Sequence, residues 1–320
     1  YPFIIKVYED ITQLYGYPTY REINPTPFLA LTFPLLFGLM FGDLGHGIIL
    51  AVGSYIFYKL AVSEGLRRFA AVLTLCGIFS AVAGALYGEV FGFHLFPPIL
   101  LSPVEDALDM VIISLWIGVI HIALGMAIDV INKIRERNLT ETFITAIPKL
   151  GLFLSGVALV VTKGLTFTQW KLTELPVLLP LVFLAILFFG KPALHAYEHG
   201  RAKVFITALG EQFFEVFDVV LKFISNTVSY VRIFALAVAH WSLLFTFYIL
   251  AELVSGVPLG FILYIIVAVS GNLLTMFLEG IIVFAHTLRL HFYEWFSKFF
   301  TGEGVPFTPF ELEKVALQRG

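Results

Sequence analysis

The sequence predicts an all-α integral membrane protein with about eight transmembrane helices, of which the last two are long and strongly tilted. The first observation is composition, because 59% of the 320 residues are hydrophobic and only 13% are charged. A soluble domain carries about 25% charged residues, so an ordinary soluble enzyme is excluded. The second observation is a series of long apolar runs, and the third is the uneven distribution of Lys and Arg between them.

Composition also limits the function. The net charge of −3, without a basic block, excludes nucleic-acid binding. The single cysteine, Cys76, lies in an apolar run, so we expect it to pack in the core and exclude a disulfide framework or a cysteine metal site. The sequence contains no GxxxxGK(S/T) run, which argues against a nucleotide site. We expect no cofactor and no metal.

The chain divides into three parts. Residues 1–26 mix polar and aromatic residues and start at Tyr1 without a signal-peptide pattern. We interpret them as a cytoplasmic lead-in segment whose preceding soluble N-terminal domain is missing. Residues 27–301 hold the apolar runs and form the transmembrane domain, and residues 302–320 form a cytoplasmic C-terminal tail.

Each span needs about 20 mostly apolar residues to cross a bilayer. The eight candidate runs cover residues 27–41, 44–60, 68–88, 108–131, 144–162, 175–190, 211–254 and 259–300. The break between the first two contains Gly42, Gly45 and Gly47, which predicts a sharp reversal and a short helical hairpin.

The last two runs are unusually long. Residues 211–255 contain neither Gly nor Pro, and residues 259–301 contain no Pro. Each run therefore predicts one continuous helix of roughly 60 Å at 1.5 Å per residue. Because this is about twice the hydrocarbon thickness, we expect these helices to tilt strongly or to project from the membrane.

The basic residues predict the orientation. With eight spans and a cytoplasmic start, fifteen of the 20 Lys and Arg residues fall on the cytoplasmic side, and only Lys163 and Lys171 fall on the other side. Both termini are therefore predicted to be cytoplasmic. The other three basic residues lie within the spans: Lys222, Arg232 and Arg289.

The seventh span carries a polar stripe. An arginine or aspartate at a helix centre costs about 2.5–3.5 kcal/mol on insertion scales, so such a charge indicates a functional site. The stripe occupies about 80° of the helix surface and comprises Asp218, Lys222, Ser225, Ser229, Arg232 and His240. It predicts a water-accessible path for ions. Asp218 and Lys222 are four residues apart, and the alternative is that they only neutralise each other.

The eighth span continues this pattern. Glu279 and His286 are seven residues apart and lie on one face, about 10 Å apart along the axis. In the predicted orientation, Glu279 lies at a depth comparable with His240, on the external side of Arg232, while Asp218 lies on the cytoplasmic side. This arrangement predicts two offset half-channels that meet at Arg232, whose guanidinium keeps its proton.

Other polar residues in or near the spans have simpler interpretations. Arg289 lies near the cytoplasmic end of its span, where its side chain could instead extend to the interface. His121, between two isoleucines, is predicted to be a packed and hydrogen-bonded histidine. Glu89, Glu105 and Asp106 fall in an external loop and are predicted to be solvated.

Several stretches resemble the membrane half of subunit a, also called subunit I, of the V-type and archaeal A-type rotary ATPases. Residues 15–26 and 33–47, with the sequence FPLLFGLMFGDLGHG in the second, are similar to the lead-in and first hairpin of that family. Residues 225–240, SNTVSYVRIFALAVAH, are similar to the stretch that carries its indispensable arginine. Residues 278–291 and 298–310 resemble its last helix and tail.

The resemblance implies a role for each residue. Arg232 would face the rotating ring of c-ring proteolipid subunits and displace the ion from each passing carboxylate. Arg289 would support the ring-facing surface. The residues implied for the external half-channel are Glu279, His240, His286 and Asp43, and Asp218 is implied for the cytoplasmic one. Ser225 and Ser229 of the polar stripe are further half-channel candidates. Some members of the family have a lysine at the start of the fourth span, which this sequence lacks.

The resemblance also implies partners and a location. The partners would be the c-ring, the surrounding lipid and, through the missing N-terminal domain, peripheral-stalk subunits. The host would more often be a prokaryotic plasma membrane than a eukaryotic endomembrane, and the ion could be H⁺ or Na⁺. The chain would hydrolyse nothing itself. Two alternatives stay open: an ion-coupled secondary transporter, and an anchor whose polar stripe docks another membrane subunit.

Overall fold

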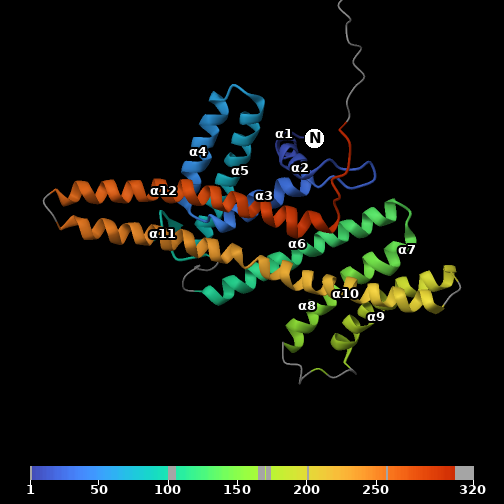
Figure 1. Cartoon of the computed structure of the whole chain (residues 1–320). Coiled ribbons are helices and arrows are strands. Elements are labelled where there is room, and N and C mark those ends of the chain that lie inside the picture. The colour runs from blue at the N-terminus through green and yellow to red at the C-terminus, as the bar shows by residue number, and fades with distance from the viewer. Residues whose placement is uncertain are drawn as a thin grey trace, which may run out of the picture.

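The computed structural model describes residues 2–99, 106–164, 170, 174–199, 202–256 and 259–306. These residues are almost entirely helical, with one small β-hairpin, which confirms the all-α class (Figure 1). Among them, six helical stretches are long and apolar enough to cross a membrane. The first two predicted spans form shorter apolar helices, so the count of eight is not confirmed.

The elements follow the predicted runs closely. In chain order they are α1 (Phe3–Val7), α2 (Glu9–Tyr15), α3 (Thr26–Met40), α4 (Leu44–Leu60), α5 (Glu64–Tyr87), β1 (Glu89–Val90), β2 (Phe93–His94), α6 (Ala107–Arg135), α7 (Leu139–Glu141), the π-helical turn η1 (Thr142–Ala146), α8 (Ile147–Lys163), α9 (Leu175–His199), α10 (Ala202–Ser229), α11 (Arg232–Ser255), α12 (Gly260–Arg289), the π-helical turn η3 (Leu290–Trp295) and the 3₁₀ turn η4 (Phe296–Lys298).

The predicted hairpin of the first two spans is wrong. Helices α3 and α4 do not pack along each other, and both pack against α5 instead. The glycines explain this, because a Cβ on Gly47 would lie 2.3 Å from the backbone nitrogen of Ala81, and one on Gly84 would lie 2.1 Å from that of Leu44. Small residues on both helices therefore allow the α4 and α5 backbones to approach closely. Figure 1 shows these two helices side by side.

The seventh span forms one helical stretch of 48 residues, Ala208–Ser255, but a local break interrupts the continuous helix that the sequence predicts. Helix α10 ends at Ser229 and α11 begins at Arg232, and the intervening Tyr230 and Val231 donate to the carbonyl groups three residues earlier. The side chain of Tyr230, at this break, is fully buried and packs against α6. A Cβ on Gly118 of α6 would lie 2.6 Å from the Tyr230 ring, so this glycine makes room for the tyrosine.

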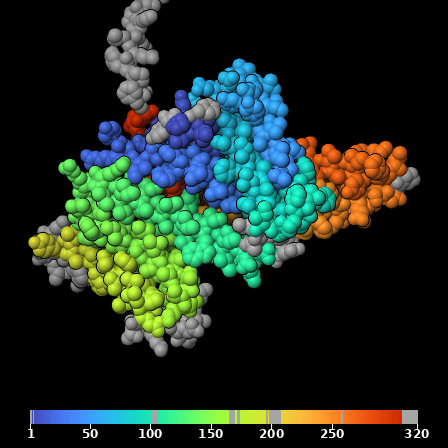
Figure 2. Space-filling view, turned by 180° about the vertical axis from the view of Figure 1, so that it is seen from behind, coloured from blue at the N-terminus to red at the C-terminus, as the bar shows by residue number. Residues whose placement is uncertain are grey.

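Helix α12 continues without a gap through η3 and η4, so that residues 260–298 form one helical stretch of 39 residues. Helices α11 and α12 pack along each other, and Figure 1 shows this pair lying steeply across α4 and α5. The lengths of 48 and 39 residues agree with the prediction of two long helical stretches at the end of the chain. Figure 2 shows the α11–α12 pair projecting from one side of the molecule.

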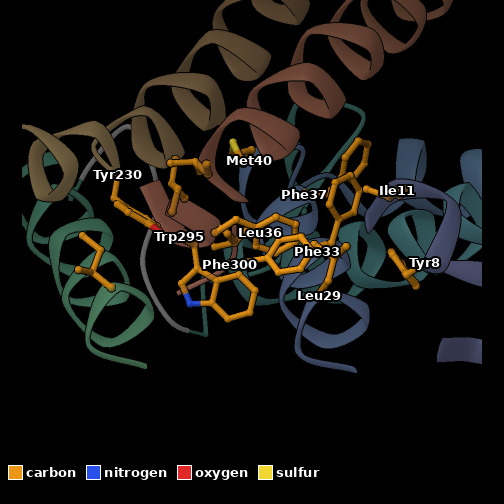
Figure 3. Close-up of a cluster of buried hydrophobic side chains, with 14 of the residues drawn as sticks. Tyr8, Ile11, Leu29, Phe33, Leu36, Phe37, Met40, Tyr230, Trp295 and Phe300 are labelled. Carbon is orange, nitrogen blue, oxygen red and sulfur yellow. The ribbon is translucent and has the colours of Figure 1, made fainter. Parts of the chain in front are cut away.

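The core lies where the lead-in segment, α3 and the end of the α12 stretch meet. Figure 3 shows its aromatic and aliphatic side chains, which include Tyr8, Phe33, Phe37 and Trp295, all fully buried. Cys76 is fully buried in the same cluster, which confirms the prediction that it packs. The position of η3, and of every functional group on it, is therefore fixed by this core.

Polar contacts also tie the lead-in segment to the end of the α12 stretch. The side-chain amide of Asn132 on α6 accepts from Ile23 N at 3.0 Å and donates to Phe299 O at 3.1 Å. Burial by itself would raise the pKa of Glu22, but hydrogen bonds from Thr19 and Thr301 lower it below its usual value. The two ends of the described chain thus form one unit around α6.

Candidate functional site

Arg232 is the first residue of α11 and lies directly after the helix break. Its Nε donates to Ser229 O at 2.8 Å, and its Nη2 donates to the Ser229 hydroxyl. Nη2 also lies 3.4 Å from Oε1 of Glu294, and the arginine side chain is 15% exposed. The break therefore turns the guanidinium back onto the last turn of α10 and toward η3.

Glu294 was not predicted as a site residue. It is 5% exposed, and its Oε1 accepts from the Ser229 hydroxyl at 2.6 Å as well as from Arg232. The signal was present, because Glu294 lies within the predicted eighth span between aromatic residues and meets the same criterion as Glu279. What the sequence does not show is the π-helical turn, which rotates Glu294 onto the face that meets Arg232.

The two other α12 residues predicted near Arg232, His286 and Arg289, differ in whether they reach its guanidinium. His286 Nδ1 is 3.5 Å from Arg232 Nη1, so His286 lies beside the arginine rather than beside Glu279. Arg289 is exposed and makes no hydrogen bond or ion pair within the described residues. Helix α12 thus presents His286 and, through η3, Glu294 to Arg232.

A second cluster lies further along α11. His240 Nδ1 is 2.5 Å from Oε2 of Glu279, and both side chains are at most 3% exposed. The structure therefore brings into contact Glu279 and His240, which the sequence predicts at comparable depths. From Arg232 to His240 the helix rises about 12 Å at 1.5 Å per residue.

Asp43 and His46 complete this cluster from the start of α4. Asp43 caps the helix, because its Oδ1 accepts from His46 N at 2.8 Å. The His46 ring lies beside the same carboxylate, and its Nδ1 is 3.3 Å from Nε2 of His240. His46 was not predicted as a site residue, although an Asp at a helix N-cap and a His three residues later occupy the same turn.

The β-hairpin covers the cluster. Phe91 and Gly92 have φ values of 51° and 76°, which closes the tight two-residue turn between β1 and β2. This turn points Gly92 N at Oδ2 of Asp43, 2.8 Å away, and places the Phe91 ring against His46. The turn therefore holds the second oxygen of the Asp43 carboxylate.

Glu89 corrects a prediction. The sequence suggests a solvated loop charge, but Glu89 on β1 is 1% exposed because the hairpin folds back onto the cluster. The pKa of its carboxyl is raised to about 7, because burial raises it by more than His240 lowers it, and Asp43 raises it further. Of the two other residues predicted with it, Glu105 lies outside the described residues.

An open cavity of about 520 Å³ adjoins the hairpin. Gly92, His94, Phe245, Tyr248 and Glu252 are among its lining residues. The Tyr248 hydroxyl donates to Phe91 O at 3.0 Å, which fixes α11 to the turn. Because Gly92 both lines the cavity and binds Asp43, the cavity ends one residue from the buried cluster.

The rest of the predicted stripe does not join these clusters. Asp218 and Lys222 form an ion pair at 2.6 Å, and both side chains are more than half exposed. This geometry supports the alternative in which they neutralise each other. Ser225 is exposed on the same helix, α10, and only Ser229 reaches Arg232. The helix break separates the part of the stripe on α10 from the part on α11.

His121 on α6 is packed, as predicted. It is 4% exposed, its Nδ1 is 2.7 Å from the Tyr230 hydroxyl, and its ring stacks on Trp295. The histidine thus connects the helix break to η3, and both of these elements hold Arg232. Chemically, the α11–α12 stretches carry one group of buried ionisable side chains around an arginine and, together with the start of α4, a second group around two histidines with carboxylates.

Comparison with known proteins identifies the family. The sequence profile described as "V-type ATPase 116kDa subunit family" matches residues 4–97 and 193–312. The chain is 33% identical, over 99% of its length, to A-type ATP synthase subunit I of Aeropyrum pernix. It is 28% identical to the subunits I of Saccharolobus solfataricus, over 96% of the chain, and Methanocaldococcus jannaschii, over 98%.

The chain spans about half the length of these relatives, namely 51%, 53% and 48% of them in the same order. The matched residues include both clusters, because Asp43 and His46 lie in the first matched range, and Arg232, His240, Glu279 and Glu294 lie in the second. The apolar helices and these similarities show a multi-pass membrane protein. The chain belongs to the V-type ATPase 116kDa subunit family.

Proposed function

We propose that this chain is the ion-translocating domain of a rotary ATPase stator. In this proposal, two offset half-channels meet at Arg232, against a rotating c-ring, and couple H⁺ or Na⁺ movement to rotation. The observation that carries the proposal is the half-buried guanidinium of Arg232, which Ser229 and Glu294 hold at the start of α11. An arginine in this setting keeps its charge and attracts a passing carboxylate without giving up a proton.

The second cluster supports an external half-channel. The groups proposed to line it are Asp43, His240, Glu279 and His286, with His46 added from the structure. The cavity beside the hairpin is proposed as the approach to this cluster, because Gly92 lines the cavity and also binds Asp43. Buried polar groups in a membrane are costly, and a path for ions accounts for their presence.

On the other side of Arg232, Asp218, Ser225 and Ser229 on α10 are proposed to face the cytoplasmic half-channel. The exposure of Asp218 and Ser225 fits a surface that water reaches. Arg289, exposed on the facing helix, is proposed to support the surface that meets the ring. The proposed domains are residues 1–26 as lead-in segment, 27–301 as ion-translocating domain and 302–320 as tail.

The proposal also includes orientation and partners. Both termini are placed in the cytoplasm of a prokaryotic cell, and peripheral-stalk subunits are expected to bind the other half of the full-length subunit. Synthesis or hydrolysis of ATP would take place in other subunits of the complex. This chain would contribute no catalytic residue to that reaction.

The rival is an ion-coupled transporter that acts alone. The break at Tyr230 removes one sequence argument against it, because transporters often have interrupted helices at their sites. The family relationship favours the rotary complex.

The test compares sealed vesicles that contain the purified complex with vesicles that contain the full-length subunit alone. We expect ATP-driven ion uptake only with the complex, and co-purification of the subunit with a ring of small proteolipids. Ion-coupled solute uptake by the subunit alone would contradict the proposal.

A further inference from the structure

We propose that Asp43, His46 and His240 form a binding site for a divalent transition-metal ion such as Zn²⁺, and that the bound metal blocks the external half-channel. The block rests on the proposed function, but the binding itself does not. No metal was expected from the sequence, because the two histidine ligands, His46 and His240, are 194 positions apart in the chain.

The ligand atoms have the spacing of a metal site. Zinc with Zn–N distances of about 2.0–2.1 Å in tetrahedral geometry requires its two ligand nitrogens to lie about 3.3–3.4 Å apart. His46 Nδ1 and His240 Nε2 are 3.3 Å apart. Asp43 Oδ1 lies 3.6 Å from His46 Nδ1, and Asp43 Oδ2 lies 4.0 Å from His240 Nε2. One ligand atom from each of the three residues lies within 4.8 Å of the other two.

Glu279 prepares His240 for this role. Metal-binding histidines commonly donate their other ring N–H to a carboxylate, which fixes the ring and its tautomer. Glu279 Oε2 lies 2.5 Å from His240 Nδ1. When an ionised Glu279 accepts the proton of this nitrogen, Nε2 presents a lone pair to His46 and Asp43. A cation between the two imidazoles satisfies both facing nitrogen atoms.

The site is rigid before any metal binds. Both oxygens of Asp43 accept a backbone N–H, one from His46 and one from Gly92. All three ligand side chains are at most 1% exposed, and the rings of Phe41 and Phe91 pack against the histidines. Three protein ligands leave a fourth tetrahedral position open for water.

The donor set selects the metal. Two imidazole nitrogens and one carboxylate favour Zn²⁺, Cu²⁺ or Ni²⁺, whereas Mg²⁺ and Ca²⁺ prefer oxygen ligands. The metal would reach the site through the cavity that ends at Gly92. Once bound, it would place a double positive charge on the proposed path of a cation and occupy the side chains that line it.

Binding is measured on the purified complex, by competition for Zn²⁺ with a chromophoric chelator. We expect His46→Gln to weaken the site by at least about 100-fold, and Glu279→Gln, which removes the carboxylate partner, by about 10–100-fold. His94→Gln is the matched control, because His94 is partly exposed at the cavity and is not a ligand. Excess Mg²⁺ should not displace the zinc. The zinc X-ray absorption spectrum of the His46→Gln complex is subtracted from that of the native complex. The difference spectrum should show a zinc ion with two imidazole ligands.

The outcomes separate the two proposals. Equal Zn²⁺ affinity in the native complex and the His46→Gln variant, or a site without imidazole ligands, would overturn the metal site and leave the rotary function untouched. If binding follows the expected order but Zn²⁺ does not inhibit ATP-driven ion uptake, the proposed block is wrong. Recovery of ATP-driven ion uptake by the native complex when a chelator removes the Zn²⁺ would support it.

Discussion

Replacing Arg232 by alanine is expected to abolish ATP-driven ion transport by the reconstituted complex. The guanidinium is the only described cation within reach of both Ser229 and Glu294, and alanine removes its charge from the point where the proposed half-channels meet. Transport is measured as ion uptake into sealed vesicles, and ATP hydrolysis is followed on the same vesicles. Hydrolysis that continues without uptake shows that the complex is assembled but uncoupled.

A lysine at position 232 tests whether transport needs only the positive charge or also the shape of the guanidinium. Lysine keeps a positive charge but cannot reproduce the planar fork, in which Nε binds Ser229 O while Nη2 binds the Ser229 hydroxyl and Glu294. We expect Arg232→Lys to lower transport by about tenfold or more, because charge-assisted hydrogen bonds of about 1.5–3 kcal/mol are lost. Arg135→Ala, in the exposed last turn of α6, is the control and should transport normally. Normal transport by Arg232→Ala would rule out the proposed mechanism.

Replacing Glu294 by glutamine is expected to have the second largest effect. The substitution keeps the shape of the side chain but leaves Arg232 without its nearest negative charge. Removing one partner of a buried ion pair costs about 3–5 kcal/mol, whereas an exposed pair contributes about 0–1 kcal/mol. The Arg232–Glu294 pair is largely buried, so we expect the guanidinium to move and ion transport to fall by at least about tenfold.

The matched control is Glu215→Gln. Glu215 binds Lys191 at 2.7 Å, but both side chains are about one third exposed, so we expect little change in transport. Because Ser229 joins Arg232 and Glu294, the effects of Ser229→Ala and Glu294→Gln should be less than additive in the double variant. Equal transport by Glu294→Gln and Glu215→Gln would show that Glu294 does not position Arg232.

Apolar run length and intramembrane charge predicted much of this architecture. The positions of all the long helices followed from runs of about 20 apolar residues, and the pairing of Glu279 with His240 followed from counting depth along two antiparallel helices. These features depend on local sequence and on helix geometry alone. Arg232 was found because an arginine at the centre of a span is costly.

The features that the sequence did not predict depend on packing between distant elements. The break at Tyr230 has no Gly or Pro nearby, and it arises because Gly118 and His121 on α6 receive the tyrosine. Glu294 reaches Arg232 only through a π-helical turn. The glycines of α4 were assigned to a reversal, but they allow close packing on α5.

The separation of the two proposed half-channels at Arg232 is tested most directly by labelling cysteines from each side of sealed vesicles. Ser225→Cys on α10 and Phe245→Cys in the cavity wall are treated with a membrane-impermeant thiol reagent, and the native chain gives the background because its only cysteine, Cys76, is fully buried. We expect the reagent to label position 225 only from the cytoplasmic side and position 245 only from the external side. Labelling of both positions from the same side would contradict a pair of half-channels that meet at Arg232.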